Sequence, residues 1–307
     1  MKLAFLFAGQ GSQRAGMGRD LYESSASFRE AFEAAELDFD IRRVCFENPD
    51  GMLDKTQYTQ PCMVAFAAGV TAALREAGIV PAYAAGLSLG EYSALHASGV
   101  FTAKEAVELA AFRGRAMAKA SEGIESAMTA VLGMDRQALA RCCEEASELG
   151  VVQICNYNCP GQLVIGGEAA AVRRAGELAR AAGARRLMPL RVSGPFHTPL
   201  MQSAGEALQK RFETQPFGEM RIPVLFNCLG HERGNETVAE LLVRQVVSSV
   251  YMEDTIRELM RLGVDTAVEI GPGRALSGFV QKTVGEAITC HAVQDVPSLE
   301  AAIAALQ

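Results

Sequence analysis

A serine between two glycines is the feature of this sequence best placed to do chemistry. Ser88 lies in Gly86-Leu87-Ser88-Leu89-Gly90, between a stretch with strand character and one with helical character. The glycines relieve crowding where a chain turns sharply from strand to helix, as in the nucleophile elbow of serine enzymes. Unpaired backbone N–H groups at the helix start would stabilise negative charge there. A plain turn with a capping serine is the alternative, and the flanking elements favour the nucleophile.

A serine hydroxyl needs a base in order to react at neutral pH, and the chain has four histidines. His197 lies in Ser193-Gly194-Pro195-Phe196-His197-Thr198-Pro199, where two prolines and a glycine restrict the backbone. His96 ends the helix that starts at the serine, which places it too far away. His231 lies in a charged loop, and His291 follows a strand-like segment. We therefore favour His197 as the base over an ordinary loop histidine.

A helix predicted from Thr102 to about Ala120 carries an arginine on its apolar face. The capping box Thr102-Ala103-Lys104-Glu105 marks its start. Arg113 shares one face with Leu109 and Met117 by helical spacing. A guanidinium on that face needs an anionic or multiply accepting partner. It could form an internal salt bridge or a two-point clamp for a substrate carboxylate, and the spacing leaves both open.

A second glycine-rich turn, Gly9-Gln10-Gly11, directly follows the predicted strand Leu3–Phe7. Loops at the carboxyl ends of parallel strands converge on one crevice, so this turn could offer an N–H to an oxyanion beside the serine. Gly271-Pro272-Gly273-Arg274 fails the dinucleotide-binding spacing and is interpreted as a structural turn. No phosphate-loop signature is present.

The composition of the 307-residue chain argues against several classes of protein. Apolar residues make up 49% and charged residues 21%, enough for one large domain with a smaller one attached. A net charge of −7 argues against a nucleic-acid partner. The N-terminal apolar run ending at Ala8 is at the bottom of the length range of signal peptides and lacks a cleavage pattern after it, so a buried first strand is favoured. No run approaches a membrane span. Eight cysteines lack metal-site spacing and are interpreted as reduced thiols of a cytosolic protein, without a metal.

Strands alternate with helices along most of the chain, which predicts an α/β fold with a mostly parallel sheet. Predicted strands are Leu3–Phe7, Ala82–Leu87, Val224–Asn227 and Thr266–Ile270. Predicted helices include Asp20–Ala35, Gln60–Ala77, Leu89–Ala97, Met201–Phe212, Thr237–Met260 with a break at Ser248–Tyr251, and Ala275–Val284. Between Ser126 and Leu190 the order is instead β-α-β-β-α-β, the ferredoxin-like split. We expect a large domain from 1–124 and 192–307, with a ferredoxin-like subdomain, 125–191, inserted.

Together these motifs resemble the malonyl-CoA:acyl carrier protein transacylase family. They run in family order over nearly the whole chain, and the family fold, an α/β-hydrolase-like domain with a ferredoxin-like insert, agrees with the predicted elements. The matching segments are Gly9-Gln10-Gly11-Ser12-Gln13, Thr59-Gln60-Pro61, Gly86-Leu87-Ser88-Leu89-Gly90-Glu91-Tyr92, Arg113-Gly114-Arg115, Asn156-Tyr157-Asn158-Cys159-Pro160-Gly161-Gln162, Phe196-His197-Thr198-Pro199-Leu200-Met201, Val243-Arg244-Gln245 and Glu269-Ile270-Gly271-Pro272-Gly273.

The resemblance implies that Ser88 is the acylated nucleophile, His197 its base and Arg113 the arginine that holds the malonyl carboxylate. The implied reaction is a ping-pong transfer from malonyl-CoA to the phosphopantetheine thiol of acyl carrier protein, for fatty acid synthesis. Coenzyme A thioester is a substrate, so no cofactor is implied. We expect a cytoplasmic monomer with no membrane partner.

Supporting roles also follow from the resemblance. Backbone N–H groups of Gln10 and Leu89 would form the oxyanion hole. The main-chain carbonyl of Gln245 would orient the histidine in place of a carboxylate, and Gln60 would line the pocket.

The chain departs from the family at two positions. Leu87 stands where many members have histidine, and Ala8 where many have proline. Phe196, directly before His197, is a feature in which the chain resembles the malonyl-selective members of the family. Because carrier protein is acidic, a basic patch is expected, with candidates Arg185, Arg186 and Arg191.

Three other interpretations remain open at this point. One is a trans-acting acyltransferase of a polyketide synthase, which these residues do not distinguish. Another is a serine thioesterase or esterase that uses Ser88, Glu269 and His291 in the chain order of α/β-hydrolases. The third is a scaffold that kept the fold without the activity.

Overall fold

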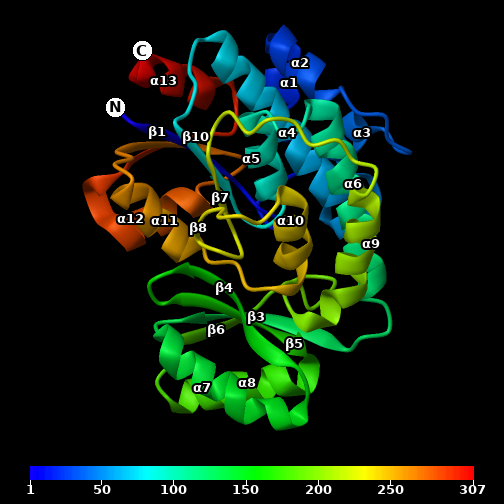
Figure 1. Ribbon diagram of the computed structural model, residues 1–307, viewed down its shortest axis with the longest axis vertical. Helices are drawn as coiled ribbons and strands as arrows, with labels where there is room; N and C mark the ends of the chain where they lie inside the picture. Colours follow the sequence, from blue (N-terminus) through cyan, green and yellow to red (C-terminus); the bar gives the residue numbers. More distant parts are fainter.

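The computed structural model describes residues 1–307, which form two separate sheets. Figure 1 shows the larger sheet among helices in the upper part of the molecule and the smaller sheet below it. An α/β fold with a mostly parallel sheet is confirmed. None of the helices combines the length and apolar character that crossing a membrane requires.

The large sheet has six strands in the order β10-β9-β1-β2-β7-β8, and only β8 is antiparallel to its neighbour. Its strands are β1 (Leu3–Phe7), β2 (Tyr83–Gly86), β7 (Val224–Phe226), β8 (His231–Glu232), β9 (Thr266–Ile270) and β10 (Thr289–Val293). The four predicted strands are all present. β8 and β10 lie at the two edges, where partial exposure removes the apolar run that marks a central strand. His231, predicted in a loop, lies in β8, and His291 lies within β10 rather than after a strand.

Side chains of β1 alternate between two cores that lie on opposite faces of the large sheet. Phe5 and Phe7 belong to a cluster of 55 buried residues, whereas Ala4 and Leu6 belong to a cluster of 15. Figure 1 shows α4, α5 and α6 on one side of this sheet and α11 and α12 on the other. Helices therefore cover both faces, as a parallel sheet requires.

Eleven α-helices belong to the part of the chain outside the small sheet. They are α1 (Arg19–Ser24), α2 (Ala26–Phe32), α3 (Ile41–Glu47), α4 (Thr56–Glu76), α5 (Gly90–Ser98), α6 (Ala103–Ala120), α9 (Gln202–Phe212), α10 (Val238–Val247), α11 (Met252–Arg261), α12 (Ala275–Val284) and α13 (Val296–Leu306). Short 3₁₀ turns occupy Pro49–Asp54, Ser147–Leu149, Pro199–Met201 and Gly285–Ala287. The capping box predicted at Thr102 is present at the start of α6.

The prediction of one continuous helix from Asp20 to Ala35 was wrong, because the segment forms two helices. α1 and α2 meet at Ser25, whose extended backbone ends the first helix. The Ser25 hydroxyl accepts the N–H of Phe28 and so caps the second. Apolar spacing continues across the break, which is why the sequence pattern concealed it.

Helix α4 begins at Thr56, one turn before the predicted start, so Pro61 lies inside it. Proline has no N–H, and the helix lacks one hydrogen bond there. α6 crosses α4 at this turn, where a Cβ on Gly114 would stand 2.8 Å from the Thr56 carbonyl oxygen. Backbone-to-backbone packing of the two helices therefore supports the turn that the proline weakens.

The small sheet has four antiparallel strands in the order β4-β5-β3-β6. This is the strand order of a ferredoxin-like fold. Its elements are β3 (Ser126–Leu132), α7 (Arg136–Ala146), β4 (Val152–Cys159), β5 (Gln162–Glu168), α8 (Ala169–Ala181) and β6 (Arg186–Pro189). One face packs against α7 and α8 in a core of 14 residues. The other face contributes Met128, Ala130, Cys155 and Val164 to the largest core, so the two sheets share apolar packing.

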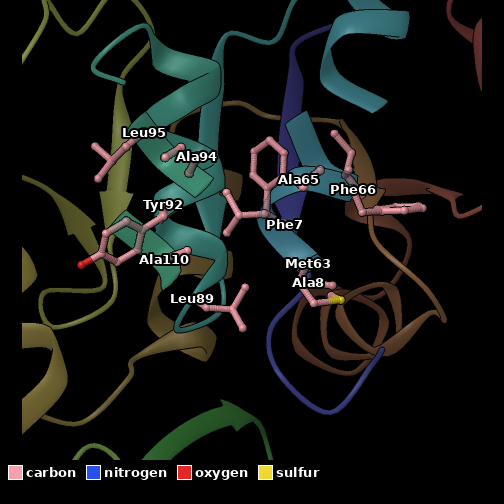
Figure 2. Packing of buried hydrophobic residues seen from close by; sticks show 14 of the residues in the cluster. Phe7, Ala8, Met63, Ala65, Phe66, Leu89, Tyr92, Ala94, Leu95 and Ala110 are labelled. Carbon is pink, nitrogen blue, oxygen red and sulfur yellow. The ribbon is translucent and has the colours of Figure 1, made fainter. Parts of the chain in front are cut away.

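The turn from β2 into α5 is packed against the end of β1. A Cβ on Gly90 would overlap the Phe7 carbonyl oxygen, and a Cβ on Gly86 would overlap the Gly90 backbone. Figure 2 shows Phe7 between side chains of α5, such as Tyr92, and side chains of α4, such as Phe66. Glycine is required at both ends of the turn because the backbone leaves no room for a side chain.

We predict opposite effects for two glycine-to-alanine substitutions in helices. Gly90→Ala places a methyl group on the Phe7 carbonyl and should lower the free energy of unfolding by about 1–3 kcal/mol or more. Gly278→Ala in α12 meets no atom within 4 Å and should raise it by about 0.5–1 kcal/mol. Urea denaturation measures both, and a Gly90→Ala midpoint at or above that of Gly278→Ala would contradict the packing described.

Candidate active site

The loops that follow three neighbouring strands meet at one edge of the large sheet. Gln10 follows β1, Ser88 follows β2 and Asn227 follows β7, and these strands are adjacent in the order β1-β2-β7. The Gly9 turn contacts the serine turn, since a Cβ on Gly9 would stand 2.7 Å from the Leu87 carbonyl oxygen. Parallel strands point their carboxyl ends to the same edge, so the topology itself assembles this cluster.

Ser88 and His197 form a hydrogen-bonded pair, although 109 positions separate them. The Ser88 Oγ lies 2.8 Å from His197 Nε2, and His197 Nδ1 lies 2.9 Å from the main-chain carbonyl oxygen of Gln245. A carbonyl oxygen only accepts hydrogen bonds, so Nδ1 carries the proton. In the neutral ring Nε2 is then free to accept the serine proton, as a base must.

Both members of this pair have left-handed backbones, with φ of 53° at Ser88 and 61° at His197. For non-glycine residues such conformations cost about 1–3 kcal/mol each and persist only where neighbours hold them. Asn227 Oδ1 accepts the Ser88 N–H at 2.6 Å, and Gln245 Nε2 donates to the Ser88 carbonyl at 2.9 Å. Gln153, from β4 of the small sheet, donates to the His197 carbonyl at 2.8 Å. Side-chain amides therefore hold the backbone of both residues.

Arg113 is fully buried beside the serine, and no carboxylate pairs with it. Its Nη1 donates to Gln60 Oε1 at 2.7 Å, and its Nη2 donates to Gln245 Oε1 at 2.8 Å and to Ser88 Oγ at 3.2 Å. The Nε has no partner, and the guanidinium carbon lies 5.7 Å from the centre of the Tyr92 ring. None of the ion pairs within 4.0 Å includes this residue, so the internal salt bridge that the sequence left open is not formed.

Burial, and secondly the charge of Arg113, lower the pKa of His197 to about 4. Both effects disfavour the imidazolium ion, and they outweigh the acceptor that Gln245 offers. Burial also lowers the pKa of Arg113, but guanidinium remains charged at any physiological pH. At neutral pH the site therefore holds a neutral imidazole next to a fixed positive charge.

Two backbone N–H groups beside the serine have no acceptor within the chain. They belong to Gln10, on the turn after β1, and to Leu89, which caps the start of α5. The side chain of Gln10 is engaged with Thr56 Oγ1 at 3.1 Å, which leaves its backbone group for a ligand. An N–H at a helix start combines an unpaired donor with the positive end of the helix dipole, so it suits an oxyanion.

Glu91 is a buried acid that the sequence reasoning left without a role, although it lies in the quoted serine motif. Its Oε2 accepts the backbone N–H of Asn227 at 2.6 Å, and its Oε1 has no partner. Burial raises the pKa of Glu91 to about 8, against the opposing effects of the Asn227 hydrogen bond and the Arg113 charge. Asn227 and Gln153 were missed as well. Asn227 ended a predicted strand, and only the strand order places it beside the serine.

The residues of the esterase alternative lie elsewhere. The carboxylate of Glu269 accepts the N–H groups of Leu276 and Ser277, so it caps the start of α12. His291 lies on β10 in register with Val268, and neither residue bonds to the serine. His96 is occupied by the Phe101 carbonyl at 3.1 Å.

The two departures from the family motifs have simple structural consequences. The N–H of Ala8 donates to the Ile270 carbonyl at 3.0 Å, a bond that proline at this position could not make. The Leu87 side chain faces Gly9, where a Cβ would stand 3.1 Å from the leucine Cγ. An apolar contact thus stands where a histidine would offer a hydrogen bond.

A hydroxyl bonded to a neutral imidazole, at the carboxyl edge of a parallel sheet, is the arrangement of enzymes that transfer acyl groups through serine. In agreement, residues 4–304 match the acyl transferase domain family. The "Malonyl CoA-acyl carrier protein transacylase" of Bacillus subtilis (strain 168) is 41% identical over 310 residues, covering 100% of this chain and 98% of the relative. The chain belongs to the malonyl-CoA:acyl carrier protein transacylase family, as the motifs predicted.

Solved structures of relatives have the same fold over their whole length. The crystal structure of MCAT from Streptococcus pneumoniae is 42% identical with a TM-score of 0.94, and the match covers 99% of this chain and 100% of that one. Another relative, PlMCAT, was solved as a malonyl-transacylase in complex with AntF, a type II PKS acyl-carrier protein. It is 36% identical with a TM-score of 0.95, covering 99% of this chain and 100% of that one.

The low pKa of His197 predicts how Ser88 reactivity depends on pH. A neutral fluorophosphonate should label Ser88 at an undiminished rate down to about pH 5 and more slowly only near pH 4, where the imidazole gains a proton. Arg113→Ala removes a positive charge that disfavours imidazolium, so the acidic limb should move to higher pH. Arg115→Ala, a half-exposed neighbour on α6, is the control and should leave the limb in place. An unshifted limb in Arg113→Ala would show that its charge does not act on the base.

Proposed function

We propose that this chain transfers a malonyl group from malonyl-CoA to the phosphopantetheine thiol of acyl carrier protein, through an ester on Ser88. The proposal is supported by full-length relatives that bear this name. The observation that carries it is the position of Arg113, a buried charge 3.2 Å from the serine hydroxyl with only neutral partners. A carboxylate on the acyl group would supply the missing negative charge.

The first half-reaction moves the acyl group onto the serine. His197 Nε2 takes the proton of Ser88 as Oγ attacks the thioester carbonyl carbon. The negative oxygen that develops would accept hydrogen bonds from the N–H groups of Gln10 and Leu89. When the intermediate collapses, the carbon–sulfur bond breaks, the sulfur takes the proton from the His197 imidazolium, and coenzyme A leaves as the free thiol.

The second half-reaction reverses these steps with a different thiol. The phosphopantetheine thiol gives its proton to His197 and attacks the ester carbonyl carbon. The bond to Ser88 Oγ breaks, and the serine oxygen takes the proton back. One thioester replaces another, so the transfer is close to balanced and the enzyme need only lower the barrier. Water must be kept from the ester, and a site that limits water access to the acyl group would serve that purpose.

Arg113 explains a preference for malonyl over acetyl groups. Its Nη atoms are positioned by Gln60 and Gln245, whose oxygens fix the plane of the guanidinium. The planar group presents parallel N–H bonds that suit a carboxylate. An acetyl group would leave the buried charge uncompensated, whereas a malonyl group neutralises it.

The proposal also concerns which carrier protein accepts the malonyl group and which pathway it supplies. We favour fatty acid synthesis, in line with the resemblance. Supply to a polyketide synthase is the second candidate, because PlMCAT was solved with a type II PKS acyl-carrier protein. Relative transfer rates to the two kinds of carrier protein distinguish them. Arg185, Arg186 and Arg191 remain our candidates for the surface that meets an acidic carrier.

We also propose how the chain is divided and where it acts. Residues 125–191 form an inserted subdomain between 1–124 and 192–307, which is consistent with the separate antiparallel sheet. Eight free thiols, seven of them buried, suit the reducing cytoplasm. Exposed large apolar side chains are few and mostly scattered, which suits a monomer.

Intact-mass analysis after brief exposure to malonyl-CoA tests the covalent intermediate. The protein should gain one malonyl group, and Ser88→Ala should gain none. His197→Ala should load far more slowly, whereas His291→Ala should load normally because His291 lies on a distant strand. If Ser88→Ala gains the same mass, or only His291→Ala abolishes loading, the proposed transfer through the Ser88–His197 pair is wrong.

The specificity of loading tests the role of Arg113. Arg113→Ala should slow loading from malonyl-CoA by the equivalent of roughly 2–5 kcal/mol, the cost of losing one partner of a buried charge pair. Loading from acetyl-CoA should change much less, and Arg115→Ala is the matched control. Rapid-quench measurement of the loading rates from malonyl-CoA and acetyl-CoA gives the ratio of the two rates for each variant. Equal reductions in the loading rate from the two donors would mean that Arg113 supports the structure without binding the carboxylate.

A further inference from the structure

Asn227 connects both sides of the serine turn, yet no step of the proposed reaction uses it. Its side chain accepts the Ser88 N–H at 2.6 Å and donates to the Gly86 carbonyl at 2.6 Å. Its own N–H donates to Glu91 Oε2 at 2.6 Å, and its carbonyl accepts the Tyr251 N–H at 2.9 Å. Asn227 is 1% exposed, so all four contacts are shielded from water.

We propose that Asn227 is a positioning residue that keeps Ser88 in its left-handed, reactive conformation, and that Glu91 holds Asn227 in place. The inference deepens the proposed function and depends on it only in that Ser88 is the nucleophile. Asn227 touches neither the hydroxyl nor the acyl group, and it acts through the backbone of the turn.

The geometry explains why this backbone needs support. Ser88 has a φ of 53°, and relaxation to negative φ would swing its Oγ away from His197 Nε2. The same rotation would turn the Leu89 N–H, which follows Ser88 in the chain. Asn227 engages the N–H of Ser88 and Gln245 engages its carbonyl, so the strained residue is held from both sides by different elements.

The chemistry of the contacts explains why an amide is suited to this position. The two contacts need one acceptor, for the Ser88 N–H, and one donor, for the Gly86 carbonyl. Asparagine provides both on one planar group, whereas aspartate would place an oxygen against the Gly86 carbonyl. The buried carboxyl of Glu91 needs only to accept the Asn227 N–H, and a glutamine oxygen could also do so.

Labelling of Ser88 by a fluorophosphonate tests the proposal, because this reagent contains neither a carboxylate nor coenzyme A. Asn227→Ala should label about 10- to 100-fold more slowly than wild type, since two buried hydrogen bonds to the turn are lost. kcat should fall in the same proportion for malonyl and acetyl donors, while KM for malonyl-CoA changes by no more than about twofold. This pattern differs from that of Arg113→Ala, in which loading from malonyl-CoA should fall much more than loading from acetyl-CoA.

Leu74→Ala is the control for a general loss of stability. Leu74 is fully buried near the end of α4, in the large core and away from the serine turn. Its truncation should lower the melting temperature and leave the labelling rate of folded protein unchanged. Wild-type labelling in folded Asn227→Ala, or a comparable loss in Leu74→Ala, would overturn the proposal.

Glu91 provides a second test that does not depend on the folding of Asn227→Ala. Glu91→Gln retains an acceptor for the Asn227 N–H and should label faster than Glu91→Ala. Equal labelling of the two variants would overturn the role given to Glu91. If the wild-type protein is labelled by the fluorophosphonate but never forms a malonyl adduct, the proposed function is rejected and this inference is not. The two failures are therefore distinguishable.

Discussion

The hydrogen bond between Ser88 and His197 is the interaction on which the rest of the site depends. It joins two residues in strained left-handed conformations, with 2.8 Å between Ser88 Oγ and His197 Nε2, although 109 positions separate them along the chain. The third partner is the Gln245 carbonyl rather than a carboxylate. A carbonyl fixes the orientation and tautomer of the ring without the full negative charge that would stabilise imidazolium. The base consequently stays neutral over a wide pH range, although it is weaker than one paired with a carboxylate.

A buried positive charge beside this pair gives the site its selectivity. Arg113 is surrounded by amides, a hydroxyl and an aromatic ring, and each lowers the cost of burial without cancelling the charge. Burial is the main cause of the low pKa of His197, and the same charge lowers this pKa further. Recognition of a carboxylate and tuning of the base are therefore two consequences of one side chain.

The scaffold places these groups through close backbone packing. The serine turn lies against the end of β1, where Gly90 meets the Phe7 carbonyl, and α6 crosses α4 where Gly114 meets Thr56. These contacts hold α5, which follows Ser88, against β1 and hold α6, which carries Arg113, against α4. Gln153 extends the support to the small sheet, whose outer strand thereby holds the backbone of His197. Such contacts leave little freedom for the reacting groups to drift apart.

Features that depend on neighbours along the chain could be predicted from the amino-acid sequence. The serine turn, the capping box at Thr102, the apolar face that carries Arg113 and the ferredoxin-like order of elements are all local patterns, and the structure contains them. The restricted loop around His197 already favoured it as the base, and the family resemblance added Gln245.

Contacts between residues far apart in the sequence could not be predicted and follow from the arrangement of the folded elements. The order β1-β2-β7 brings Asn227 to the serine, burial without an ion pair leaves Arg113 available to a ligand, and packing between the sheets brings Gln153 to His197. Edge strands and the break between α1 and α2 also escaped prediction. The physical reason is the same in each case: strand order and packing between elements depend on long-range contacts, which local periodicity does not encode.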